Sequence, residues 1–121
     1  MSASALRQYQ HQAVRSASPA ALVDKLYGIG MTAARSGDAL RTRRALVELT
    51  SALDLERGGE LAASLRELYA FAIRSANAGD LGIVAELLEG LRQAWRAGPL
   101  ASERSADGTG LQAVREPALA A

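Results

Sequence analysis

The sequence predicts an all-α protein, an antiparallel up-down four-helix bundle with an N-terminal arm and a disordered C-terminal tail. Three observations support this prediction. Alanine, leucine and arginine, which are good helix formers, are abundant, whereas aromatic residues make up only 4% of the 121 residues. Four segments repeat apolar residues at helical spacing. Only short glycine-containing breaks separate these segments, which favours antiparallel neighbours in a bundle.

The composition also narrows the possible classes of function. The chain has no cysteine, which excludes disulfide scaffolds, thiolate metal sites and cysteine nucleophiles. A net charge of +1 gives no electrostatic reason to expect a nucleic-acid partner. No segment approaches the roughly 18 unbroken apolar residues of a membrane span, so we expect no membrane insertion and a cytoplasmic location. Because His11 is the single histidine, we expect no catalytic residues, no metal site and no cofactor.

The two ends of the chain differ from its middle. Residues 1–16 are polar and rich in glutamine, and are predicted to form a flexible N-terminal arm. Residues 98–121 contain alanine, serine, glycine and charged residues without periodicity, and are predicted to be a disordered tail. The four-helix bundle is therefore expected within residues 17–97.

The first helix is predicted from about Pro19 to Arg35. Ser18 can cap it, and proline suits its first position. Gly28 and Gly30 weaken this helix by about 1 kcal/mol each relative to alanine, but they also create a shallow surface of small residues. We favour close packing inside the bundle for this surface, and a weak homodimer is the alternative. The apolar face of the helix contains Leu22, Leu26, Ile29 and Ala33.

The second helix is predicted to begin after Gly37, which can close the first helix, and Asp38, which can cap the second. It is expected to run to about Arg57. Two glycines then form the predicted hinge to the third helix. Gly58 is expected to adopt the left-handed conformation, and Gly59 to let the chain turn back. The apolar face of the second helix contains Leu46, Leu49, Thr50 and Leu53.

The third and fourth helices are predicted at about residues 59–77 and 80–97. The break between them, Asn77-Ala78-Gly79-Asp80, repeats the Gly-Asp chemistry of the first break and indicates two similar helical hairpins. Gly98-Pro99 ends the fourth helix. The third helix has the clearest core face, with Leu61, Leu65, Leu68, Tyr69, Ala72, Ile73 and Ala76. The face of the fourth contains Val84, Leu87, Leu88, Leu91 and Trp95.

Several short motifs occur along the chain in a characteristic order. The most specific is the run Leu-Asp-Leu-Glu-Arg-Gly-Gly-Glu at residues 53–60, and a less specific one is Ala17-Ser18-Pro19 followed by Leu26-Tyr27-Gly28. Over about residues 6–96, these motifs resemble the flagellar export chaperone family FliS. Further positions that fit the resemblance are Tyr9, Val14, Leu22-Val23, Leu61, Leu65, Leu68-Tyr69, Ala76-Asn77, Asp80 and Ala94-Trp95.

The resemblance implies a bundle that holds the disordered C-terminal segment of flagellin in apolar grooves and prevents its premature polymerisation. It also implies delivery of flagellin to FlhA, a protein of the flagellar type III export gate, with Leu6 and Tyr9 at the family's N-terminal apolar contacts. The residues predicted to bind partners are Leu6, Tyr9, Val14, Tyr27, Leu46, Leu49, Leu53, Tyr69, Ile73 and Asn77.

The chain departs from the family's pattern in two respects. Gly28 stands where the family usually has an acidic residue after Leu-Tyr. The two hairpins are shorter than those of the family by about four turns and about two turns, toward the Gly37 and Gly79 loops. Two alternatives therefore stay open: a family-like adaptor with a different client, and a structural helical bundle that mediates dimerisation.

Overall fold

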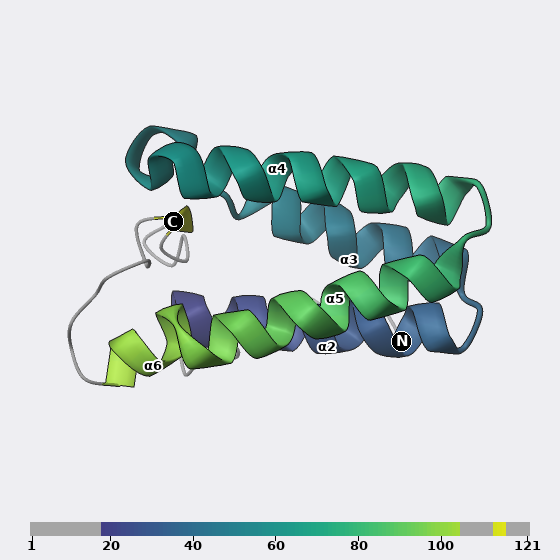
Figure 1. Ribbon diagram of the computed structural model, residues 1–121, viewed down its shortest axis with the longest axis horizontal. Coiled ribbons are helices and arrows are strands. Elements are labelled where there is room, and N and C mark those ends of the chain that lie inside the picture. Colours follow the sequence, from purple (N-terminus) through teal and green to yellow (C-terminus); the bar gives the residue numbers. More distant parts are fainter. Residues whose placement is uncertain (1–17, 105–112, 116–121) are drawn as a thin grey trace, which may run out of the picture.

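The computed structural model describes residues 18–104 and 113–115. Neighbouring helices of the bundle are α2 with α3, α3 with α4, α4 with α5, and α5 with α2, and they alternate in direction (Figure 1). The all-α four-helix bundle that the sequence predicts is therefore confirmed. Its helices are α2 (Pro19–Arg35), α3 (Ala39–Ser51), α4 (Leu55–Asn77) and α5 (Leu81–Ala97), followed by the short α6 (Pro99–Arg104).

Helix α2 begins and ends as the sequence predicts. The Ser18 hydroxyl accepts a hydrogen bond of 3.1 Å from the backbone N–H of Ala21, and this bond satisfies one of the free donors at the helix start. Pro19 occupies the first turn, where its missing N–H costs nothing.

No helix among the residues described is long and apolar enough to cross a membrane.

The two Gly-Asp breaks close their helices in the same way. Gly37 and Gly79 have φ angles of 80° and 86°, the left-handed region that glycine tolerates best. The N–H of Asp38 donates to the carbonyl of Ala33 over 2.9 Å, and the N–H of Asp80 donates to that of Ser75 over 2.8 Å. These bonds satisfy the last carbonyls of α2 and α4. Because both helices close with the same geometry, the two hairpins are similar, as predicted. Their loops lie at the same end of the bundle (Figure 1).

The junction between α3 and α4 differs from the sequence prediction. Helix α3 ends at Ser51 rather than near Arg57, and α4 begins at Leu55. The cause is Asp54, whose carboxylate accepts a 3.0 Å hydrogen bond from the N–H of Arg57 and thereby caps α4. A cap that satisfies a free N–H donor fixes the helix start three residues before the glycine pair.

The roles of the two hinge glycines are also reversed. Gly59 has φ 53° and ψ −131° and kinks α4 after its first turn. Gly58 has no positive φ, and its N–H donates to the carbonyl of Asp54 over 2.7 Å, as in a helix. The prediction that Gly58 takes the left-handed conformation is therefore wrong, and Gly59 is the residue whose backbone requires glycine.

Three aromatic residues join α2, α4 and α5 in the core. The hydroxyls of Tyr27 and Tyr69 form a buried hydrogen bond of 2.6 Å, and the indole N–H of Trp95 donates to the carbonyl of Ala20 over 2.8 Å. The rings of Tyr27 and Trp95 meet edge to face, with centroids 6.2 Å apart. Burial raises the pKa of Tyr27 to about 12 and raises the pKa of Tyr69 further, so both hydroxyls are neutral at physiological pH.

An ion-pair cluster holds α5 against α2. The carboxylate of Asp24 accepts hydrogen bonds from Arg96 Nε over 2.7 Å and from Arg92 Nε over 3.2 Å. Burial opposes the charged form of Asp24, but the bonds from Arg96 and Arg92 together outweigh it, and its pKa lies below the usual value. A β-carbon at Gly28 would lie 2.7 Å from the Arg92 guanidinium, and one at Gly30 would lie 2.9 Å from Leu88. Gly30 is buried, which confirms close packing for this part of α2.

The C-terminal part of the chain also departs from the sequence prediction. Residues 98–121 were expected to be disordered, but Pro99–Arg104 forms α6. Val114 forms an antiparallel bridge with Leu53, and both Ala113 and Val114 belong to the hydrophobic core. Nothing in this segment has a periodic apolar face, and a pairing through backbone atoms leaves no such signal. The remaining residues of the tail, and the predicted N-terminal arm, lie outside the described part of the chain.

Candidate functional site

Large hydrophobic side chains are exposed along one side of α4. Leu61, Leu68 and Phe71 have exposed fractions of 44%, 37% and 45%. They follow one another at spacings of seven and three residues, which places them on one flank of the helix. The sequence predicts Leu61 and Leu68 in the core, and the structure shows that this placement is wrong.

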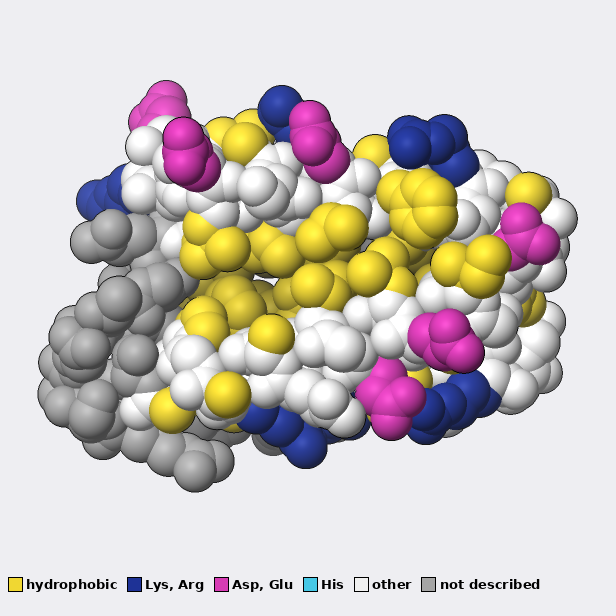
Figure 2. Space-filling view, viewed as in Figure 1, with side chains coloured by type: hydrophobic (Ala, Val, Ile, Leu, Met, Phe, Trp, Pro, Cys, Tyr) yellow, Lys and Arg dark blue, Asp and Glu magenta, His cyan; other side chains and the backbone are white. Residues whose placement is uncertain are grey.

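Helix α5 presents a matching flank. Ile83 has an exposed fraction of 49%, while Leu87 and Leu91 are half-buried against the core. These residues are spaced by four, so they also share one side of their helix. Figure 2 shows hydrophobic side chains along the line where α4 and α5 meet, with a hollow between the two helices. We call this surface the α4–α5 seam, formed by Leu61, Leu68, Phe71, Ile83, Leu87 and Leu91.

The seam is open because the ion pairs that hold α5 lie on its opposite side, toward α2. Arg92 and Arg96 bind Asp24 of α2, and Glu89 forms an ion pair of 3.1 Å with Arg35 at the end of α2. Among the residues described, no ion pair or side-chain hydrogen bond connects α4 with α5, and of the four neighbouring pairs these two helices make the least contact. In Figure 1, α4 and α5 diverge with distance from the Gly79 loop that joins them.

Charged residues border the seam on both helices. Glu60, Glu67 and Arg74 are exposed on α4 at spacings of seven residues, and Glu86 is exposed on α5. Figure 2 shows charged side chains above and below the band of hydrophobic ones. The surface thus combines an apolar floor with a polar border, the arrangement of a groove that accepts an amphipathic helix.

The structure places most of the predicted partner-binding residues away from this surface. Ile73 is half-buried and Asn77 is exposed at the end of α4. Leu6, Tyr9 and Val14 lie outside the described ranges. Five others are core residues, with exposed fractions between 0% and 3%, and offer no surface to a partner in this conformation: Tyr27, Leu46, Leu49, Leu53 and Tyr69. A partner-binding role for these residues stays a prediction and requires the bundle to open.

Sequence reasoning missed the two most exposed seam residues, Phe71 and Ile83. Both are apolar residues that lie off the main apolar stripe of their helix. The signal that could have identified them is an apolar stripe that is wider than the face a helix buries in the core.

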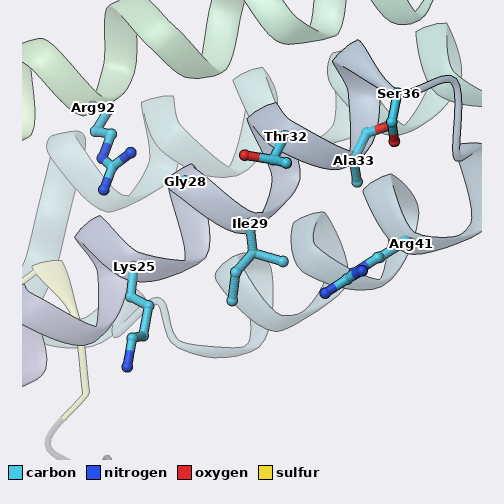
Figure 3. Close-up of a pocket in the computed structure, with 8 residues that line it drawn as sticks. All are labelled: Lys25, Gly28, Ile29, Thr32, Ala33, Ser36, Arg41 and Arg92. Carbon is cyan, nitrogen blue, oxygen red and sulfur yellow. The ribbon is translucent and has the colours of Figure 1, made fainter.

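A second hollow lies on the outer side of α2. It has a volume of about 350 Å³. In Figure 3, Lys25 and Ile29 project from α2, with Arg41 of α3 and Arg92 of α5 on either side of them. The lining contains three basic side chains and no acidic one, and the hollow is open to solvent. Its remaining lining residues are Gly28, Thr32, Ala33 and Ser36.

Neither hollow contains the residues of a metal site. Within residues 18–104 and 113–115, no group of three histidine, cysteine, aspartate or glutamate residues could hold a metal ion. The feature that these residues offer to a partner is the apolar surface along the seam, since Arg92 in the second hollow is already bound to Asp24.

The comparison with protein families gives a match to the model described as Flagellar protein FliS, over residues 30–101. This range covers more than half of the 121 residues and includes the end of α2, all of α3, α4 and α5, and the start of α6. The comparisons with curated proteins and with solved structures gave no match.

Proposed function

We propose, on the premise that this chain belongs to the FliS family of flagellar proteins, that it is an export chaperone that binds the C-terminal segment of flagellin along the α4–α5 seam. The observation that carries this proposal is the seam itself. Three exposed hydrophobic residues of α4 and one of α5 border a hollow that no side-chain bond of the described residues spans. Apolar surface of this kind is typical of a site for a partner helix.

The seam suits a client that folds on binding. A disordered segment with apolar residues at helical spacing can form a helix along the groove, with its apolar face toward Leu68 and Phe71. The ordering of the segment costs conformational entropy, and the burial of apolar surface on both sides offsets this cost. A client held in this way has its own apolar face covered, which keeps it from polymerising before export.

Delivery to the export gate completes the proposed role. The N-terminal residues Leu6 and Tyr9 are proposed to contact FlhA in the cytoplasm, and Val14 to belong to the same arm. This part of the proposal rests on the resemblance of the sequence to the family. It requires neither a cofactor nor a catalytic step.

Binding of a synthetic flagellin C-terminal peptide to the purified protein, measured by calorimetry, tests the proposal. We expect saturable binding to the parent and at least about ten-fold weaker binding to Leu68→Glu, because a loss of about 1.4 kcal/mol corresponds to a factor of ten in Kd. Leu40→Glu is the matched control, since Leu40 is a leucine of α3 with an exposed fraction of 52%. Its affinity should equal that of the parent.

The possible results of this experiment distinguish whether the protein binds flagellin from where on its surface it does so. If the peptide does not bind the parent, the adaptor with a different client becomes the better hypothesis. If it binds Leu68→Glu and Leu40→Glu equally well, flagellin binding stands but the seam is the wrong surface. A parent that binds no peptide and elutes as a dimer in size-exclusion chromatography would favour the structural bundle.

A further inference from the structure

The junction between α3 and α4 pairs with a segment from the other end of the chain. The N–H of Asp54 donates to the carbonyl of Ala113 over 2.9 Å, and the N–H of Arg115 donates to the carbonyl of Ala52 over 2.7 Å. Leu53 and Val114 face each other between these two bonds as an antiparallel bridge. In Figure 1 the segment lies beside the start of α4, at the end of the bundle away from the Gly37 and Gly79 loops.

The pairing exists because the helices are interrupted at this point. Between the end of α3 at Ser51 and the start of α4 at Leu55, the backbone of Ala52–Asp54 has polar groups that helical hydrogen bonds do not satisfy. The segment 113–115 supplies a carbonyl and an N–H to two of them. Any extended chain can supply the same two groups, because they belong to the backbone.

The side chains of the segment set the size of residue that the site accepts. Ala113 is 1% exposed and Val114 is 7% exposed, and both pack within the hydrophobic core, whereas Arg115 is exposed. A carboxylate at the position of Val114 would be buried without a partner, which is strongly unfavourable. The site therefore selects a segment with small aliphatic residues at two successive positions, the second of which pairs with Leu53.

The contact is small compared with the helices around it. Among the residues described, two backbone hydrogen bonds and two small side chains hold the segment, whereas α3 and α4 are held by their own helical bonds and by the core. Segments with few buried contacts open locally without unfolding the rest of a protein. The junction can then be vacated while the four helices stay in place.

We propose that the α3–α4 junction is a peptide-docking site that residues 113–115 fill as an internal occupant, and that a segment of another chain with an Ala-Val-like pair can replace them. The internal occupant belongs to the same chain as the junction, and intramolecular occupants reach effective concentrations in about the millimolar range. A competing segment must exceed this value or add contacts of its own. The proposal does not depend on what binds the α4–α5 seam.

A labelled peptide with the sequence of residues 110–118 tests the proposal with the full-length chain. Val114→Asp disengages the internal occupant, and Arg115→Asp is the matched control, because it adds the same carboxylate at an exposed position. We expect the peptide to bind Val114→Asp at least ten-fold more tightly than it binds the parent or Arg115→Asp, in a fluorescence anisotropy titration. A folded Val114→Asp protein, checked by circular dichroism, that binds the peptide no better than Arg115→Asp would overturn the proposal.

Hydrogen exchange in the unmodified protein provides a second test, which holds even if Val114→Asp does not fold. The protection factor of the Asp54 amide should be at least ten-fold lower than that of the Leu49 amide, which lies within α3. Such a difference shows that the segment leaves the junction without unfolding of the bundle. Equal protection at both amides would show that residues 113–115 are a permanent part of the core, and the docking site would then be ruled out.

Discussion

At the scale of single residues, the hydroxyl pair of Tyr27 and Tyr69 shows how a core tolerates polar groups. Each hydroxyl is buried, and the 2.6 Å bond gives each of them a partner, with one hydroxyl donating and the other accepting. For both tyrosines, the sequence pattern indicates only an apolar or aromatic position, and it does not indicate a buried hydroxyl with a partner. The sequence of the motif Leu26-Tyr27 therefore does not indicate that Tyr27 is buried in the core.

Removal of one hydroxyl should be more harmful than removal of both. Tyr27→Phe leaves the Tyr69 hydroxyl buried without this partner and should lower the free energy of unfolding by about 1–3 kcal/mol. The double variant with Tyr69→Phe should cost clearly less than the sum of the two single changes. Urea unfolding of the four proteins measures this coupling, and strictly additive losses would show that the hydroxyls do not depend on each other.

The same pair predicts how stability depends on pH. The pKa of Tyr27 is raised to about 12 and that of Tyr69 is raised as well, while an unfolded tyrosine titrates near pH 10. Above about pH 10 the folded chain therefore holds more protons than the unfolded chain, so the free energy of unfolding falls as pH rises. Thermal unfolding between pH 8 and pH 12 should show a decline in Tm that is shallower in the double phenylalanine variant.

At the scale of elements, the sequence predicts helix starts more accurately than the joint between hairpins. Ser18 and Asp38 cap α2 and α3 as expected, because a cap acts on the two or three residues that follow it. At the α3–α4 junction two signals compete, the cap at Asp54 and the glycine pair after it. The junction also pairs with Val114, a contact between distant residues that no local pattern contains.

The seam illustrates a second limit of sequence reasoning. Leu61, Leu65 and Leu68 recur at helical spacing in α4, but only Leu65 is buried. Which of these leucines is covered depends on where α5 lies, and α5 packs closely against α2 and forms ion pairs with it. The apolar stripe thus predicts the helix and the side that it turns inward, but not the boundary between core and binding surface.

The kink in α4 predicts different effects at its two glycines. Gly59→Ala should lower the free energy of unfolding by about 1–3 kcal/mol, because φ 53° with ψ −131° is unfavourable for a residue with a β-carbon. Apart from its two neighbours in the chain, no described residue has an atom within 4 Å of the position of that β-carbon, so the penalty is conformational rather than steric crowding. Gly58→Ala should change stability by no more than about 1 kcal/mol and in the favourable direction. Thermal melts of both variants decide between the two positions.

At the scale of the whole molecule, stability and client binding should be separable. Phe71 is 45% exposed, so Phe71→Glu should change the free energy of unfolding by no more than about 0.5 kcal/mol. Flagellin peptide at about one hundred times its Kd should stabilise the parent by about 2.7 kcal/mol, and should not raise the Tm of Phe71→Glu to the same extent. Equal thermal shifts in the two proteins would show that Phe71 lies outside the binding surface.

The bridge between Leu53 and Val114 also affects the order in which the chain folds. The helices of each hairpin are neighbours in sequence and can meet by closing a short loop, whereas Leu53 and Val114 are separated by all of α4, α5 and α6. Their pairing is therefore a late event that follows assembly of the helices. Contacts that form after the transition state influence the rate of unfolding and leave the rate of folding nearly unchanged. We therefore expect removal of the C-terminal pairing to speed unfolding of the bundle while leaving its rate of formation nearly unchanged.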